Sequence, residues 1–137
     1  MNNKNQYKSQ NNKQKEVNAI DIQIIASVVS IFTIIISILL LYNQKQEIKG
    51  EKTLFTAKQT QKISEFNRDV LLIIAVTFLL VNYQLYYISK EEGEPLNSYR
   101  LQIIASYLSI IAALIALYVV RNPENRGQIS DVENPII

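Results

Sequence analysis

The chain contains neither cysteine nor histidine in its 137 residues. The lack of cysteine excludes disulfides, thiol chemistry and lipid attachment at cysteine. The lack of histidine removes the commonest metal ligand and the usual general base near neutral pH. The serines of the apolar segments have no base beside them, and paired carboxylates are missing there. We therefore expect no enzyme, no cofactor, no metal and no small-molecule substrate.

Charge of either sign is modest. Fourteen Lys and Arg face twelve Asp and Glu, giving a net charge of +2. This excess is too small to indicate a nucleic-acid partner. Glycine and proline are also rare, with three residues of each. Long segments therefore run without a helix breaker.

Three of these segments are long and apolar: residues 20–42, 70–88 and 101–120. Asp21, at the edge of the first, is their only charged residue. About 20 apolar residues cross the roughly 30 Å hydrocarbon core as a helix, and these runs lack the alternation of barrel strands. The sequence predicts an all-α integral membrane protein with three transmembrane helices. Residues 20–120 form the three-span transmembrane domain, and its expected partner is the lipid bilayer.

The flanking segments are polar. Residues 1–19 are rich in Asn, Gln and Lys, and we expect them to be disordered, as we do residues 121–137. Between the first two spans, residues 53–69 lack Gly and Pro. They favour a backward helix extension of the second span. With an extension of the first span to Gly50, it would form a hairpin outside the bilayer. A flexible loop is the alternative.

The second connection contains two helix breakers. Gly93 and Pro95 predict a tight break, after which Asn97 or Ser98 can cap the third span, and Pro123 ends it. Orientation follows from basic residues. The N-terminal tail and second loop together carry six Lys and Arg, against eight for the first loop and C-terminal tail. The positive-inside rule thus favours N-out and C-in in the cell membrane.

A short sequence repeat relates the first and third spans. Residues 22–31 recur 79 positions later as residues 101–110, with seven of ten positions identical. Both copies begin a stripe with helical 3, 4, 3, 4 spacing, and every member after the Gln is small. Small residues allow close helix approach in lipid, so the stripe predicts a helix-packing face. Its members are Gln23, Ala26, Ser30, Thr33 and Ser37 in the first span and Gln102, Ala105, Ser109, Ala112 and Ala116 in the third.

Spans one and three cross the membrane in the same direction, which places repeat partners at similar depth. A Gln23–Gln102 hydrogen bond and an Asp21–Arg100 ion pair are therefore plausible, within one chain or between subunits. In the second span, Asn82 is a polar residue at membrane depth. An interhelical hydrogen bond is its first interpretation, and a pore or ligand role is the second.

These patterns favour a small structural or accessory membrane protein. It would pack with itself, as a homo-oligomer, or with a larger membrane-protein partner. The alternative is a self-assembling pore, because the chain resembles holins in its short length and three spans. The usual basic C-terminal tail of holins is missing, since acids outnumber Arg121 and Arg126 there.

Two short strings carry a second resemblance. The chain resembles small three-span membrane proteins of AT-rich Gram-positive bacteria in the Leu/Ile-Gln-Ile-Ile-Ala-Ser opening of both copies (Ile22 to Ser27 and Leu101 to Ser106) and in the Asn67-Arg68 step into span two. The resemblance implies the same fold and a cytoplasmic-membrane location. It implies no activity.

Overall fold

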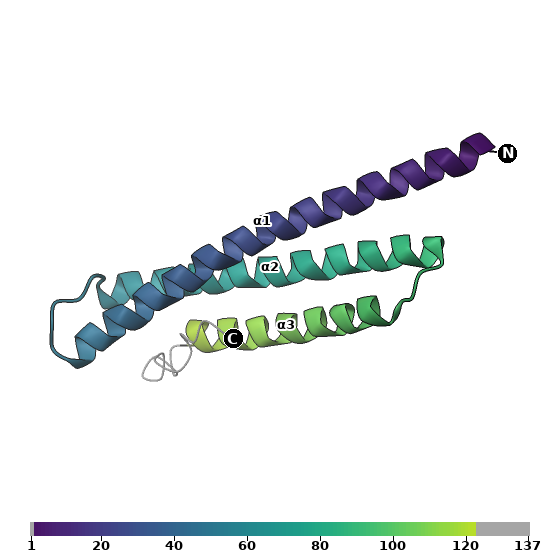
Figure 1. Ribbon diagram of the computed structural model, residues 1–137. Coiled ribbons are helices and arrows are strands. Elements are labelled where there is room, and N and C mark those ends of the chain that lie inside the picture. The colour runs from purple at the N-terminus through teal and green to yellow at the C-terminus, as the bar shows by residue number, and fades with distance from the viewer. Residues whose placement is uncertain (1, 123–137) are drawn as a thin grey trace.

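The computed structural model describes residues 2–122 and consists there of three helices (Figure 1). Helix α1 spans Asn2–Ile48, α2 spans Ala57–Glu92 and α3 spans Asn97–Arg121. All three are long and apolar enough to cross a membrane. The expected all-α class and the three candidate spans are thus confirmed. The C-terminal tail from residue 123 lies outside the described residues.

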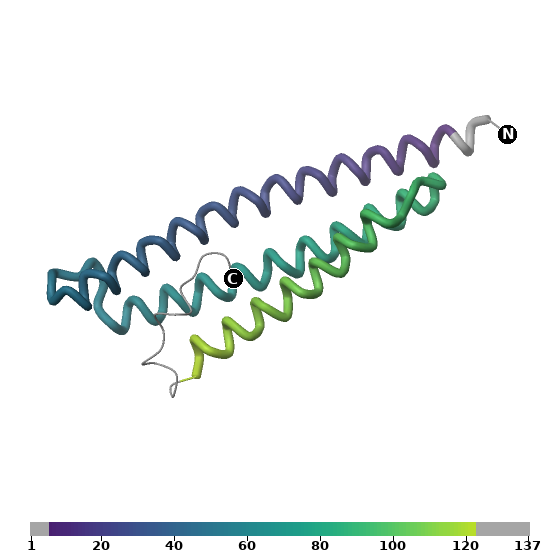
Figure 2. Tube along the Cα trace, turned by 60° about the horizontal axis from the view of Figure 1, so that its bottom comes forward, coloured from purple at the N-terminus to yellow at the C-terminus, as the bar shows by residue number. Residues whose placement is uncertain are grey.

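Helix α2 holds the bundle together. Helices α1 and α3 each pack antiparallel along α2, whereas they contact one another hardly at all. Both views show α2 with α1 and α3 running beside it (Figures 1 and 2). Spans one and three therefore run in the same direction, because the chain reverses twice between them. Each of them packs against α2 rather than against the other.

The distribution of side chains is that of a multi-pass membrane protein. Large apolar side chains such as Ile25, Ile31 and Phe32 are exposed over most of α1. Several of the most buried side chains, such as Ser37 and Asn67, are small or polar. A water-soluble bundle buries its large apolar groups instead. Lipid is as apolar as leucine, so helices in a bilayer gain nothing by hiding such groups and pack through small residues.

The polar N-terminal segment differs from its prediction. Residues 2–19 continue α1 rather than being disordered. Extending an existing helix avoids the unfavourable nucleation step, and Lys and Gln are good helix formers. The segment also contacts the far end of α2, because Asn12 Nδ2 donates to Glu91 Oε2 (3.4 Å) and Lys8 Nζ lies 3.6 Å from the same oxygen.

The first connection turns where glycine allows it. Gly50 has φ +68°, the left-handed conformation that favours glycine at a helix end. Helix α2 begins at Ala57 rather than near Thr53, because Thr56 and Gln59 form a capping box. The Thr56 hydroxyl accepts from the Gln59 backbone N–H (3.3 Å), and Gln59 Oε1 accepts from the Thr56 N–H (2.9 Å).

The second connection also turns at a glycine, but its cap differs from the expectation. Gly93 has φ +74° and ends α2. Helix α3 then begins at Asn97 with Leu96 as its N-cap residue, and no side chain caps it. Neither Asn97 nor Ser98 is a cap, because the helix begins earlier than expected. Helix α3 ends at Arg121 with Asn122 as C-cap, and Pro123 lies outside the described residues.

Candidate helix-packing site

The stripe on α1 faces α2. Ala26, Thr33 and Ser37 are buried, and Gln23 and Ser30 are partly buried. The contact is polar at its centre, where Asn67 Nδ2 of α2 donates to Ser37 Oγ (2.9 Å) and to the Thr33 carbonyl (3.2 Å). Asn67 is 1% exposed. The small side chains let α2 come close enough for an asparagine to reach the backbone of α1.

A second polar contact joins the same two helices beyond the stripe. Asn43 Oδ1 accepts from the Phe55 backbone N–H (2.7 Å), and its Nδ2 donates to Thr60 Oγ1 (3.2 Å). Asn43 is buried. It therefore ties the end of α1 to the connection and to the first turn of α2, which fixes how far the two helices can slide along each other.

Asn82 makes an interhelical hydrogen bond with α3. Its Nδ2 donates to Ser106 Oγ (2.8 Å) and, at 3.4 Å, to the Gln102 carbonyl. Both Asn82 and Ser106 are buried. Of the two interpretations offered by the sequence, the geometry matches the hydrogen bond between helices.

The stripe on α3 lies beside the α2 contact rather than in it. Gln102, Ala105 and Ser109 are exposed, Ala112 is partly buried and Ala116 is buried. The residues of α3 that are buried against the bundle are Ser106, Ala116, Leu117 and Val120. Ala116 thus belongs both to the stripe and to the buried contact of α3 with α2. Toward Gln102 the stripe turns away from that contact and becomes exposed.

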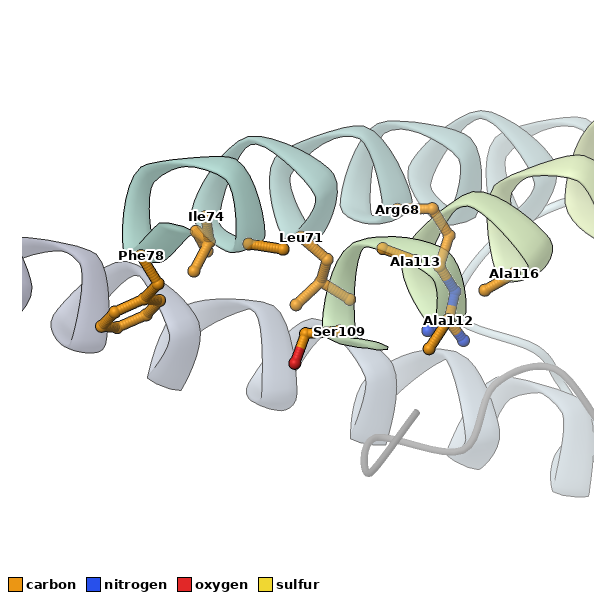
Figure 3. A pocket seen from close by; sticks show the side chains of 9 residues that line it. Arg68, Leu71, Ile74, Phe78, Ser109, Ala112, Ala113 and Ala116 are labelled. Carbon is orange, nitrogen blue, oxygen red and sulfur yellow. The ribbon is translucent and has the colours of Figure 1, made fainter. Parts of the chain in front are cut away.

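Two adjoining hollows lie between α2 and α3 along this stripe. The first, of about 270 Å³, contains Ser109, Ala112 and Ala116 in its wall, and the second, of about 220 Å³, contains Gln102 and Ala105. Figure 3 shows the first, with Phe78 at one end and Arg68 toward the other. All five stripe residues of α3 therefore line these two hollows, on the side formed by α3.

The contacts expected between repeat partners are not formed within the chain, and their formation between subunits stays a prediction. Within residues 2–122, neither a Gln23–Gln102 hydrogen bond nor an Asp21–Arg100 ion pair is present. The register explains this. Asn67 meets Ser37, and Asp69, two residues further along α2, meets Arg121. Ser37 is thus close to the level of Arg121, whereas the repeat pairs it with Ala116, more than one helical turn away.

An ion pair not foreseen in the sequence joins α2 to α3. Arg121 Nη2 donates to both carboxylate oxygens of Asp69, at 2.8 and 3.0 Å. Asp69 lies twelve residues after Ala57, the first residue of α2. It is therefore too far from the N-terminus of α2 to interact with the helix dipole there. The sequence contains a signal for this ion pair. Asp69 directly precedes span two and Arg121 directly follows span three, so the antiparallel packing of α2 and α3 brings the two residues to the same depth.

The burial of Arg68 was not predicted from the sequence, where Arg68 appears only in the Asn67-Arg68 string. Arg68 is 1% exposed, the most buried charged side chain among those described, and it lies in the wall of the larger hollow. Nothing in the sequence distinguishes it from Arg121 or Arg100, because burial of one side of α2 depends on where α3 packs.

Comparison of the chain with protein families, curated proteins and solved structures finds no match. Among residues 2–122, no group of three metal-ligating side chains is close enough to hold a metal ion. The features of the described residues that bear on function are therefore the helix faces and their contacts.

Proposed function

We propose that the chain is a small accessory membrane protein that docks on a second copy of itself or on a larger membrane protein. The docking face is the exposed part of the α3 stripe, formed by Gln102, Ala105 and Ser109. The observation that carries this proposal is an asymmetry: the α1 stripe is buried against α2, while its counterpart on α3 is exposed at these three positions.

Physical chemistry favours a helix as the occupant of this face. Small residues allow the backbones of two transmembrane helices to approach closely, and interhelical hydrogen bonds then add to dispersion. The exposed Gln102 side chain supplies a polar group for such a bond. The same combination of small residues and an amide already holds α1 against α2 at Asn67.

The membrane setting completes the proposal. The protein lies in the cell membrane with its N-terminus outside and its C-terminus inside. The end of α1 and the start of α2 project from the bilayer as a hairpin that offers a second contact point. Its capping box and the Asn43 hydrogen bonds make the hairpin tip an ordered surface.

Three variants test the docking face. Ala105→Leu and Ser109→Leu add bulk to the face, and Ser27→Leu on α1 is the matched control. Ser27 and Ser109 are both exposed, and each hydroxyl donates to the carbonyl four residues earlier in its own helix (2.7 and 2.9 Å). The Ser27 and Ser109 substitutions therefore remove the same local bond.

The measurement is native mass spectrometry of the tagged protein, extracted from its own membrane in mild detergent. We expect the wild type and Ser27→Leu to retain an oligomer or a stoichiometric partner, and the two α3 variants to lose it. Equal retention by all four proteins would contradict the docking face. So would a wild-type protein that is monomeric and alone in every mild detergent tried.

The self-assembling pore is the alternative, and the serine and threonine side chains do not favour it. The hydroxyls of Ser30, Thr77 and Ser109 donate to carbonyls of their own helices rather than facing a shared polar path. Controlled expression with a potential-sensitive dye separates the two functions. A loss of membrane potential on expression would support the pore and contradict the accessory role.

A further inference from the structure

The apolar runs of α2 and α3 lie flush with each other. Asp69, which directly precedes the run of α2, pairs with Arg121, which directly follows the run of α3. Further along, Asn82 donates to Ser106, and these two residues lie six and five residues inside the far ends of their runs. The two helices therefore present apolar side chains over the same depth.

The apolar run of α1, residues 20–42, is displaced from the other two. Gln84, four residues inside the run of α2, donates to the carbonyl of Lys15, which lies five residues outside the run of α1 (3.3 Å). Near the hairpin, Asn67, three residues outside the run of α2, donates to Ser37, five residues inside the run of α1. Figure 1 shows α1 reaching beyond α3 at both ends. The displacement is eight or nine residues, or about 13 Å of helix.

An upright bundle would place the wrong part of α1 in the hydrocarbon. Asp21 is exposed, and at this register it lies about 13 Å inside the apolar run of α2, near the middle of a core of about 30 Å. A charged side chain there is costly. Toward the hairpin, Ile35, Ile38 and Leu39 are exposed beside the polar stretch 60–69 of α2, where an upright bundle would leave them in water.

We propose that the bundle lies strongly tilted in the bilayer, so that the runs of all three helices share one hydrocarbon layer. The inference rests on the proposed membrane location and goes beyond the docking face. Transmembrane helices tilt by up to about 40°. At that tilt, a helix spacing of about 9 Å compensates a displacement of about 8 Å along the helix axis. Bilayer deformation and the long side chains of Lys15 and Lys62 accommodate the remaining few ångströms.

Tilting preserves the contacts between helices, whereas sliding α1 along α2 does not. A slide that brings the runs flush moves α1 by eight or nine residues and breaks the hydrogen bonds of Asn43 with Thr60 and of Asn67 with Ser37. Asn67 is 1% exposed, so water cannot replace the bonds that its amide would lose. A tilt of the whole bundle moves Asp21 out of the hydrocarbon and leaves these bonds intact.

A tilted bundle fits a thin bilayer. The apolar run of α3 contains 20 residues, which cross about 30 Å when the helix is upright but about 23 Å at a tilt of about 40°. The preferred lipid neighbours of the protein are therefore phospholipids with short acyl chains, whose hydrocarbon layer is several ångströms thinner than the typical core.

The test measures the average helix tilt of the full-length protein in oriented bilayers of short-chain phosphatidylcholine. Polarised infrared dichroism of the amide I band reports this angle. We expect about 40° for the wild type, against about 20° for an upright bundle. A wild-type tilt near 20° would overturn the proposal.

A variant with four leucines removes the cause of the tilt. It extends the apolar run of α1 toward the N-terminus, so that an upright bundle no longer buries charge, and its tilt should fall toward about 20°. The substitutions are Lys15→Leu, Glu16→Leu, Asn18→Leu and Asp21→Leu, all at exposed positions. The matched control places four leucines at exposed positions inside the existing run and should keep the wild-type tilt. Its substitutions are Ile24→Leu, Ile25→Leu, Val28→Leu and Ile31→Leu.

Circular dichroism should show the same helix content in all three proteins. An unchanged tilt in the variant that extends the run would contradict the proposal, as would an equal fall in the control.

Cysteine cross-linking in the same bilayers tests the register on which the tilt depends. The chain has no cysteine, so Asn43→Cys with Thr60→Cys introduces a single pair, at positions whose side chains lie 3.2 Å apart. Oxidation should link this pair within one chain, because the Asn67 bond to Ser37 is retained. Failure to link would show that α1 slides and would overturn the tilt. Protein that does not float with the vesicles would contradict the membrane location itself, and the tilt with it.

Discussion

Asn67 and Asn82 make the same contact on two different sides of α2. Each donates from Nδ2 to a serine hydroxyl on a neighbouring helix and to the carbonyl four residues before that serine, in α1 for Asn67 and in α3 for Asn82. The pairing requires both the right depth and the right rotation, because the two acceptors lie on one face of the neighbouring helix. The two asparagines therefore set the register of both outer helices.

We expect each asparagine to couple energetically with its own serine. Double-mutant cycles with alanine should give about 0.6 to 2 kcal/mol for Asn67 with Ser37 and for Asn82 with Ser106. The crossed pair, Asn67 with Ser106, should be additive. The measurement is the free energy of unfolding in mixed micelles. Coupling of the crossed pair as strong as that of the direct pairs would contradict this assignment of partners.

The helical N-terminal segment should depend on Glu91. Glu91→Gln weakens its ion pair with Lys8, and exposed pairs of this kind contribute about 0.2–1 kcal/mol. Amide hydrogen exchange in residues 6–18 should therefore become about 1.4- to fivefold faster. Glu92→Gln is the matched control, since the adjacent acid lies on another face of the helix. If the amides of this segment exchange without protection in the wild type, the segment is disordered and the helix is contradicted.

The Asp69–Arg121 ion pair should contribute little and depend on salt. Both side chains are about half exposed, at 41% and 55%, so the coupling in an Asp69→Asn and Arg121→Gln cycle should be below about 1 kcal/mol. We expect it to fall further in about 1 M salt, where charges are screened within roughly 3 Å. A coupling that is large and unaffected by salt would show that the pair is desolvated in the bilayer.

The capping box should determine where α2 begins. Thr56→Ala removes the hydroxyl acceptor for the Gln59 N–H and should cost about 0.5–2 kcal/mol in the free energy of unfolding. Thr56→Ser keeps the hydroxyl and should cost much less. Thermal unfolding in detergent compares the two variants. Equal losses would mean that the threonine methyl group, rather than the cap, stabilises this end of the helix.

Local sequence patterns are enough to predict the three helices and the two turns of this protein. Hydrophobic length predicted three helices, Gly50 and Gly93 predicted the two turns, and Asn82 was recognised as a candidate for an interhelical hydrogen bond. These features are local: the number of apolar residues, a backbone that needs a positive φ, and an amide placed in an apolar run each act within a few residues of their position in the chain.

Which helix faces meet depends on the packing of all three helices together. The repeat suggested direct pairing of Gln23 with Gln102 and of Asp21 with Arg100, because equal patterns on parallel spans predict equal depth. Both spans pack instead on α2, and the hydrogen bonds of Asn43, Asn67 and Asn82 fix a register in which repeat partners lie more than a turn apart. Two helices with matching faces need not pack together when a third helix packs against one of those faces. The burial of Arg68 and the exposure of Gln102 follow from that choice of partner, and no local pattern encodes it.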